Sequence, residues 1–216
     1  CFATRFGRDK YSYLYHQYLE KSMDLSFSVF TDDAPLPIAN ITPKKSFYWE
    51  NEDVGFFNQS ILDIEIMAEK CSAMFFVEPN IDLNSIRLPP RRYLSPQLAL
   101  TFCPEQIIKI IDVLWDAVFF NHKEKQQFEN IVGDSIINLS KMYTDTYWII
   151  TYGSEPTQVI SNGKISRYPV SKVTGNFAVG CGDVFAASYC MADMSGLDME
   201  KAIQFGHKAA SKVLKQ

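Results

Sequence analysis

The most chemically suggestive stretch of the sequence is Gly180-Cys181-Gly182-Asp183, where two glycines flank a cysteine and an aspartate follows. A run of small and apolar residues comes next, so the sequence predicts that this turn opens a helix. The first turn of a helix presents unpaired N–H groups and the positive end of the helix dipole, and glycine lets a ligand approach the backbone closely. The stretch could therefore hold an anion beside a carboxylate that takes a proton from an attacking hydroxyl.

Two other interpretations of these four residues are open. Asp183 can be a helix cap that follows a glycine turn, with no ligand involved. Cys181 can be a nucleophile activated by the helix dipole, although no partner histidine is evident in the sequence. Taken alone, the four residues favour the capped turn.

Composition restricts the class of protein. Of the 216 residues, 47% are hydrophobic and 14% aromatic, so we expect one domain with a sizeable core. The net charge of −4 gives no electrostatic reason to expect nucleic-acid binding, and no apolar run is long enough to span a bilayer. The five cysteines form no CxxC or Cys/His cluster, which is typical of reduced thiols in a cytoplasmic protein.

Strands and helices are predicted to alternate along most of the chain. The pattern indicates strands at 74–80, 117–120 and 146–153, and helices at 60–70, 104–115, 133–143, 182–193 and 198–214. Residues 81–103 are predicted to be irregular, and Asn162-Gly163 predicts a hairpin. This alternation predicts an α/β layered domain with a mainly parallel sheet.

The segment before residue 60 has a different pattern. β-like runs at 26–30, 37–41 and 46–50 follow one another without helices between them, so they predict a separate small sheet. The chain begins with Cys1, and its first residues resemble the interior of a domain. We therefore expect further residues to precede Cys1.

Residues 176–210 resemble the C-terminal signature of the ribokinase-like (PfkB-type) carbohydrate and nucleoside kinases. In that family a Gly-Ala-Gly-Asp turn opens a helix, and a second helix follows after a short loop. Here Gly180, Gly182 and Asp183 match, and Cys181 replaces the alanine.

The resemblance extends upstream in the correct order. Asn121 and Glu124 match the family's Asn-x-x-Glu strand end, and Thr151 and Gly153 match its Thr-x-Gly strand end. This order favours a ligand site at Gly180–Asp183 over a plain capped turn. The likeness covers nearly the whole chain.

The resemblance implies roles for these residues. Asp183 is expected to be the catalytic base, with the N–H groups of Gly180, Cys181 and Gly182 forming an anion hole. Asn121 and Glu124 are expected to bind Mg²⁺ through water, although a helix cap and a solvated glutamate are the plain alternative.

The nucleotide site is also implied by the resemblance. Thr151 and Gly153 are expected near ATP, and His207 near the adenine, with a turn and a half-exposed structural histidine as the alternatives. The family usually has a polar lead into the glycine turn, whereas this chain has Phe177, Ala178 and Val179, which puts nucleotide affinity in doubt. Arg87, Arg91 and Arg92 could meet a phosphorylated substrate, but they are more typical of a solvated basic loop.

The implied protein is a single ribokinase-like domain over 1–216, a three-layer α/β sandwich without the family's N-terminal strand region, in which 26–50 contributes to a small β lid. Its implied reaction is ATP- and Mg²⁺-dependent phosphorylation of a hydroxymethyl group on a sugar or nucleoside. Such lids often pair between subunits, so a homodimer is a further expectation. The alternative is a catalytically silent protein of the same fold that binds nucleotide or sugar, or acts as a regulatory subunit.

Overall fold

The computed structural model describes residues 5–8, 10–25, 29–31, 39–41, 47–49, 61–77, 83, 87–97, 99–102, 104–171 and 179–215. The chain divides into two compact units, Cys1–Met67 and Ala68–Gln216. None of the helices in these described ranges is long and apolar enough to cross a membrane.

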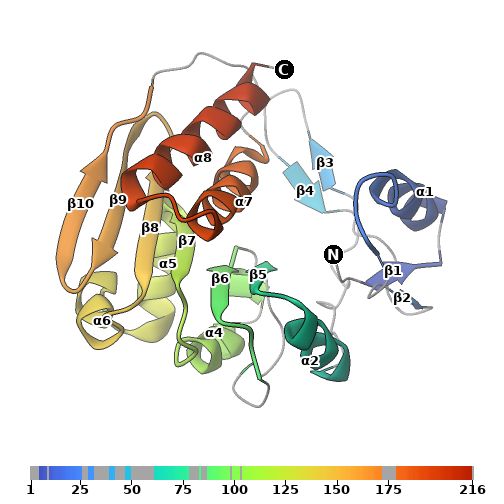
Figure 1. Cartoon of the computed structure of the whole chain (residues 1–216), viewed down its shortest axis with the longest axis horizontal. Coiled ribbons are helices and arrows are strands. Elements are labelled where there is room, and N and C mark those ends of the chain that lie inside the picture. Colours follow the sequence, from blue (N-terminus) through green and yellow to red (C-terminus); the bar gives the residue numbers. More distant parts are fainter. Residues whose placement is uncertain are drawn as a thin grey trace. The chain divides into compact units, whose positions relative to one another are not determined.

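A six-stranded sheet forms the centre of the larger unit, in the order β10-β9-β8-β7-β6-β5 (Figure 1). Its strands are β5 Ala73–Val77, β6 Arg91–Ser95, β7 Ala117–Asn121, β8 Tyr147–Tyr152, β9 Glu155–Ser161 and β10 Lys164–Tyr168. Strands β5 to β8 are parallel, while β9 and β10 are antiparallel to their neighbours. The carboxyl ends of β5 to β8 therefore meet at one edge, where open α/β sheets bind ligands.

Helices cover both faces of this sheet (Figure 1). One face carries α7 Cys181–Met194 and α8 Met199–Leu214, and the other carries α4 Pro104–Ile110, α5 His122–Val132 and α6 Ile136–Met142. The short helix α3, Ala99–Phe102, precedes α4. The predicted three-layer α/β sandwich with a mainly parallel sheet is confirmed.

Strand β7 is buried on both faces because its side chains alternate between the two helical layers. Phe119 contacts Phe185 and Tyr189 of α7 edge to face. The next residue, Phe120, contacts Phe128 of α5 and stacks on Trp148. One strand thus joins the cores of both layers.

The region predicted to be irregular contains a strand, and that prediction was wrong for Arg91–Ser95. Strand β6 pairs in parallel with β5 and β7, so its two neighbours satisfy its backbone. Tyr93 and Leu94 are its only large apolar residues, which makes the hydrophobic pattern too short to stand out. Helix α4 is also shorter than predicted: it ends at Ile110, where the Trp115 indole Nε1–H donates to the last carbonyl.

The predicted hairpin is confirmed. Asn162 and Gly163 have φ of 49° and 71°, the left-handed pair that a tight hairpin turn requires. The turn brings Ser161 opposite Lys164.

The smaller unit contains two separate strand pairs. β1 Arg5–Gly7 pairs in parallel with β2 Val29–Thr31, and β3 Ala39–Ile41 pairs with the antiparallel β4 Phe47–Trp49. Helix α1 spans Lys10–Leu19, and α2, Ile61–Lys70, contains the boundary between the units. The first predicted β run, 26–30, overlaps β2, which pairs with β1. The other two runs overlap β3 and β4, which form a small sheet. The remaining residues of the predicted lid, 26–50, lie outside the described ranges.

Gly206 allows close packing of α8 against α7. A Cβ atom at this position would lie 2.7 Å from Cδ2 of Phe185 and 3.0 Å from its carbonyl oxygen. We expect Gly206→Ala to lower the free energy of unfolding by about 1–3 kcal/mol in urea titrations, although alanine is the better helix former. Gly182→Ala is the matched control, since a Cβ there meets no atom of the described residues within 4 Å and should not destabilise the helix. Equal stability of the two variants would contradict this packing argument.

Candidate functional site

Helix α7 begins without a side-chain cap. Its N-cap is Gly180, at φ 81°, which has no side chain to close the first turn. By contrast, α5, α6 and α8 begin with Asn121, Ser135 and Asp198, whose side chains each accept from a first-turn N–H. Within the described part of the chain, the N–H groups at the start of α7 therefore have no side-chain cap from the N-cap residue, and such N–H groups can bind an anion.

Asp183, the third residue of α7, is held from another part of the chain. The Gln97 amide Nε2 donates to Asp183 Oδ1 at 2.5 Å and lies 3.2 Å from the Ser95 hydroxyl. Gln97 follows the carboxyl end of β6, so this bond joins the start of α7 to the ligand-binding edge of the sheet. The carboxylate is exposed and does not serve as the N-cap of its helix.

Asn121 and Glu124 form a capping box at the start of α5. Asn121 Oδ1 accepts from the backbone N–H groups of Lys123 and Glu124, at 2.9 and 3.0 Å. In return, the Glu124 carboxylate accepts from the Asn121 backbone N–H at 2.9 Å and from its side-chain amide at 2.5 Å. The capping alternative is thus present in the geometry, and it fixes the Glu124 carboxylate at the end of β7.

The negative charge of Asp183 affects the protonation of the Glu124 carboxyl. Partial burial raises the pKa of the Glu124 carboxyl, the bond from the Asn121 N–H opposes the rise, and the negative charge of Asp183 adds to it. Two carboxylates thus lie near each other at one edge of the sheet.

The donor set at this edge fits a magnesium ion that keeps most of its water. Mg²⁺ is usually held by one or two carboxylates together with water and substrate phosphates, and not by a protein-only cage. No group of three or more His, Cys, Asp and Glu side chains that could hold a metal occurs within the described ranges. The Glu124 oxygens, disfavoured as anions by burial and by Asp183, would gain from a nearby cation.

Thr151 and Gly153 lie at the same edge. Thr151 is in register with Asn121 on the neighbouring strand, and its hydroxyl donates to the Phe120 carbonyl at 3.4 Å. Gly153, at φ 65°, makes the turn from β8 into β9. Both residues therefore border the surface that bears Asn121.

His207 is a residue of α8, and its side chain contacts α7 and β9. Its Nε2 is 3.1 Å from the hydroxyl of the fully buried Thr157, and its ring packs against Phe185. Burial lowers the pKa of the His207 imidazole and so favours the neutral ring. One ring nitrogen is thus engaged within the protein.

The Cys181 thiol does not have the environment of a nucleophile. Its Sγ contacts the Ala210 carbonyl of α8 at 3.7 Å, so the side chain is turned toward the neighbouring helix. Burial, together with the negative charge of Asp183, raises the pKa of the thiol. Since the thiolate is the reactive form, the nucleophile alternative is not supported.

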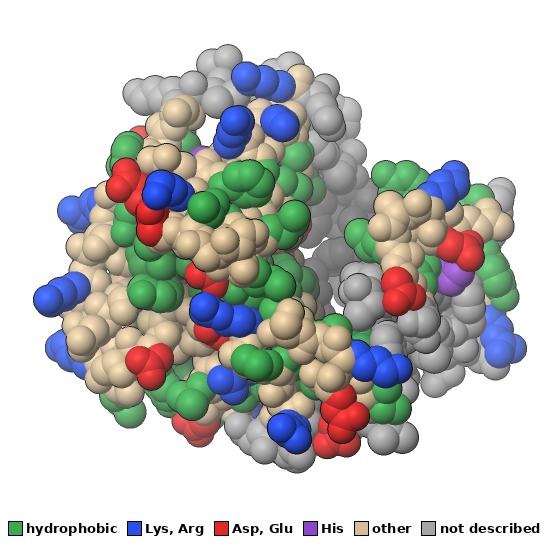
Figure 2. Space-filling model, viewed as in Figure 1, with side chains coloured by type: hydrophobic (Ala, Val, Ile, Leu, Met, Phe, Trp, Pro, Cys, Tyr) green, Lys and Arg blue, Asp and Glu red, His purple; other side chains and the backbone are tan. Residues whose placement is uncertain are grey.

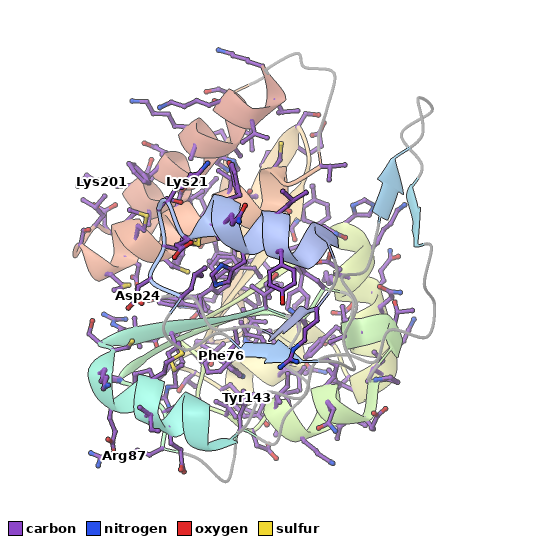
Figure 3. The ribbon with its side chains drawn as sticks, turned by 90° about the vertical axis from the view of Figure 1, so that its right-hand side faces the viewer. Lys21, Asp24, Phe76, Arg87, Tyr143 and Lys201 are labelled. Carbon is purple, nitrogen blue, oxygen red and sulfur yellow. The ribbon has the colours of Figure 1, made fainter. Side chains whose placement is uncertain are left out.

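The three arginines are not gathered at this site. Arg91 begins β6, at the opposite edge of the sheet, where its guanidinium pairs with Asp116 at 2.8 Å. Arg92, the next residue of that strand, donates its backbone N–H to the same carboxylate. Arg87 is exposed and extends away from the body of the protein (Figure 3). Acidic and basic side chains are interspersed on the face in Figure 2, as expected for a solvated surface.

Gln97 and Ser95 are the site residues that sequence reasoning missed. They belong to Ser-Pro-Gln at the end of a strand flanked by prolines, in the stretch predicted to be irregular. Recognition of the short Tyr93-Leu94 strand would have placed them at the ligand-binding edge. Phe177 and Ala178 of the apolar lead lie outside the described residues, and Val179 is exposed.

Sequence comparison identifies one family. The model of the pfkB family of carbohydrate kinases matches residues 93–216, more than half of the chain. The comparison with curated proteins found no significant match.

Solved structures of the same fold match nearly the whole chain. A nucleoside kinase of the ribokinase family from Methanocaldococcus jannaschii is 17% identical, with a TM-score of 0.74 over 98% of this chain and 73% of that one. A ribokinase from Thermotoga maritima is 16% identical, with a TM-score of 0.73 over 100% and 74%. An E. coli protein provisionally identified as a ribokinase II, solved with ATP and Mg²⁺, is 13% identical, with a TM-score of 0.76 over 99% and 76%.

Proposed function

Because this chain belongs to the pfkB family of carbohydrate kinases, we propose that it transfers the terminal phosphoryl group of ATP to a hydroxymethyl group on a sugar or nucleoside. The observation that carries the proposal is the start of α7 at Gly180, which has no side-chain cap among the described residues, beside a carboxylate that Gln97 holds from the end of β6. The similar structures include a nucleoside kinase and a ribokinase, which supports both acceptor classes.

Asp183 is proposed as the base for this transfer. It would take the proton of the acceptor hydroxyl as that oxygen bonds to the terminal phosphorus. The bond from phosphorus to the bridging oxygen breaks, and ADP leaves. Asp183 is exposed at the start of α7, so an acceptor can reach its carboxylate.

The backbone of Gly180, Cys181 and Gly182 is proposed as the anion hole. First-turn N–H groups that have no side-chain cap would stabilise the charge on the phosphoryl oxygens during transfer. A Cβ built on Gly180 or Gly182 meets no atom of the described residues within 4 Å, which supports room for a ligand beside this backbone.

Asn121 and Glu124 are proposed to hold Mg²⁺ through water, and the ion would neutralise phosphate charge. The end of β8 and the turn at Gly153 are proposed to border the nucleotide. His207, with Nε2 engaged by Thr157, is proposed to contribute to the adenine side of that site as a neutral ring. The free thiols of Cys181 and Cys190 favour a cytoplasmic location.

The experiment that tests the function is an ATP-consumption assay on the whole encoded protein against a panel of sugars and nucleosides. Turnover on one class of acceptor supports the kinase and identifies that class. Binding of nucleotide without turnover on any acceptor favours the silent binding protein. The apolar Phe177-Ala178-Val179 lead, which lacks the polar residues usual in the family, supports that alternative.

Glu124→Gln separates activity from stability. Glutamine can preserve the capping box, and it removes a carboxylate whose pKa is raised by burial and by Asp183. A raised folded-state pKa disfavours folding once the pH exceeds the ordinary glutamate value, so the variant should unfold at equal or higher urea concentration at pH 7. This advantage should shrink near pH 4, where the carboxyl is largely protonated in both states.

Turnover of Glu124→Gln should nevertheless fall by about 10- to 100-fold, and its magnesium requirement should rise. Glu105→Gln is the matched control, because Glu105 is an exposed glutamate in the first turn of α4. Unchanged turnover at limiting Mg²⁺ would argue against a metal role for Glu124.

A further inference from the structure

The hydrogen-bond partners of Gln97 determine which end of its side-chain amide faces Asp183. Both protons of its amide nitrogen are directed at oxygen atoms, Oδ1 of Asp183 and the hydroxyl of Ser95. An ionised carboxylate only accepts hydrogen bonds, so the nitrogen and not the oxygen of the amide must face Asp183. Ser95 is itself buried at the end of β6, which anchors the amide to the sheet.

The backbone of Gln97 is strained in a way that its local sequence does not require. Its φ is 39°, and Asn162 is the only other residue besides glycine with positive φ in the described ranges. Asn162 lies in a hairpin turn that needs this conformation, whereas Gln97 follows the end of a parallel strand. Such strain persists only where the surrounding structure maintains it, and it is concentrated at functional sites.

The surroundings of Gln97 maintain this conformation. Pro96 before it is buried, and the Pro96 carbonyl accepts from the Ala99 N–H at 2.9 Å. The Gln97 carbonyl accepts from the Leu100 N–H at 3.2 Å as the chain enters α3. The left-handed residue thus directs its side chain toward α7 from a fixed turn.

We propose that Gln97 is a positioning residue for Asp183: it holds Oδ1 through the Ser95–Gln97–Asp183 chain of hydrogen bonds, so that Oδ2 is left to take the proton of the acceptor hydroxyl. The inference rests on the proposed kinase function. The carboxylate of an exposed side chain at a helix start would otherwise rotate among several orientations. A reacting group displaced by about 1 Å can lose on the order of 10²-fold in rate.

The first test is Gln97→Met in the whole encoded protein, measured with the acceptor found in the panel. Methionine keeps the length of the side chain and removes the donor. We expect kcat to fall by about 10- to 100-fold while KM for the acceptor and for ATP changes by less than about 3-fold, because positioning acts on the transfer step. Gln204→Met is the matched control, since Gln204 is an exposed glutamine of α8 outside the site, and its kcat should be unchanged.

Gln97→Asn covers the case in which methionine disturbs the fold. Asparagine accepts positive φ readily and keeps the amide, but it is one methylene shorter and withdraws the donor from Asp183. It should fold as the wild type does and lose kcat as Gln97→Met does. A Gln97→Asn variant with wild-type kcat would overturn the proposal.

The second test is a double-mutant cycle with Asp183→Asn. If Gln97 acts through Asp183, then Gln97→Met should lower kcat by less than about 2-fold when Asp183 is already Asn. Equal losses in both backgrounds would mean that Gln97 acts elsewhere and would overturn the proposal. Wild-type turnover with an unaffected Gln97→Met variant overturns the role of Gln97 alone, whereas absence of turnover by the wild type overturns the kinase function and this inference together.

Discussion

Asp183→Asn is expected to lower kcat by about 10²-fold or more, the scale of a lost general base. Asparagine has nearly the shape of aspartate, and its side-chain oxygen can still accept the hydrogen bond from Gln97. The variant thus keeps the start of α7 in place and loses only the ability to take a proton. The measurement is steady-state ATP consumption with saturating acceptor, together with urea unfolding, which should match the wild type.

Asp198→Asn is the matched control for this substitution. Asp198 is an exposed carboxylate at the start of α8, where it caps the helix, and asparagine is an equally good N-cap. Its removal should leave kcat unchanged. An Asp183→Asn variant as active as this control would exclude Asp183 as the base.

Phe119→Ala is expected to have the largest effect on stability. Its ring lies 5.4 Å from that of Tyr189 and 5.9 Å from that of Phe75, and it also contacts Phe185. Truncation at the centre of this cluster should lower the free energy of unfolding by about 3–5 kcal/mol, because the transfer energy of the ring is lost and a cavity remains. Urea titration followed by fluorescence and circular dichroism measures the change.

The control for Phe119 is Phe205→Ala. Phe205 belongs to α8 and is 46% exposed. The same chemical change should therefore cost much less than it does at Phe119. Similar losses at the two positions would show that Phe119 is not the centre of the core.

Local signals made much of the fold predictable. Asn162-Gly163 identifies its hairpin because few residue pairs accept two left-handed conformations. The last two helices were predicted at nearly their observed bounds, since each has a clear start at Gly180 or Asp198. Strand β6 was missed because the two strands beside it determine its conformation more than its own residues do.

The environment of the candidate site was less predictable than its residues. The glycine turn, the Asn-x-x-Glu pair and the Thr-x-Gly strand end are visible as types and spacing. The partner of Asp183 is not, because Gln97 lies 86 positions away in the chain and contacts it only in the folded protein. The contact of His207 with Thr157, 50 positions apart, is hidden for the same reason.

The hydrogen bond from Gln97, just after β6, to Asp183 of α7 joins two segments that are 86 positions apart in the chain. This separation affects the order in which the protein folds. Strand β7, helices α5 and α6 and strand β8 follow one another directly and can associate through short connections. Helix α7, in contrast, is separated from β8 in the chain by β9, β10 and residues 169–180. We expect the layer of α7 and α8 to dock late in folding and to detach early in unfolding. An intermediate that keeps the sheet and its other helical layer would then lack both the turn proposed as the anion hole and the Asp183 carboxylate, so we expect partly folded chains not to catalyse the proposed phosphoryl transfer.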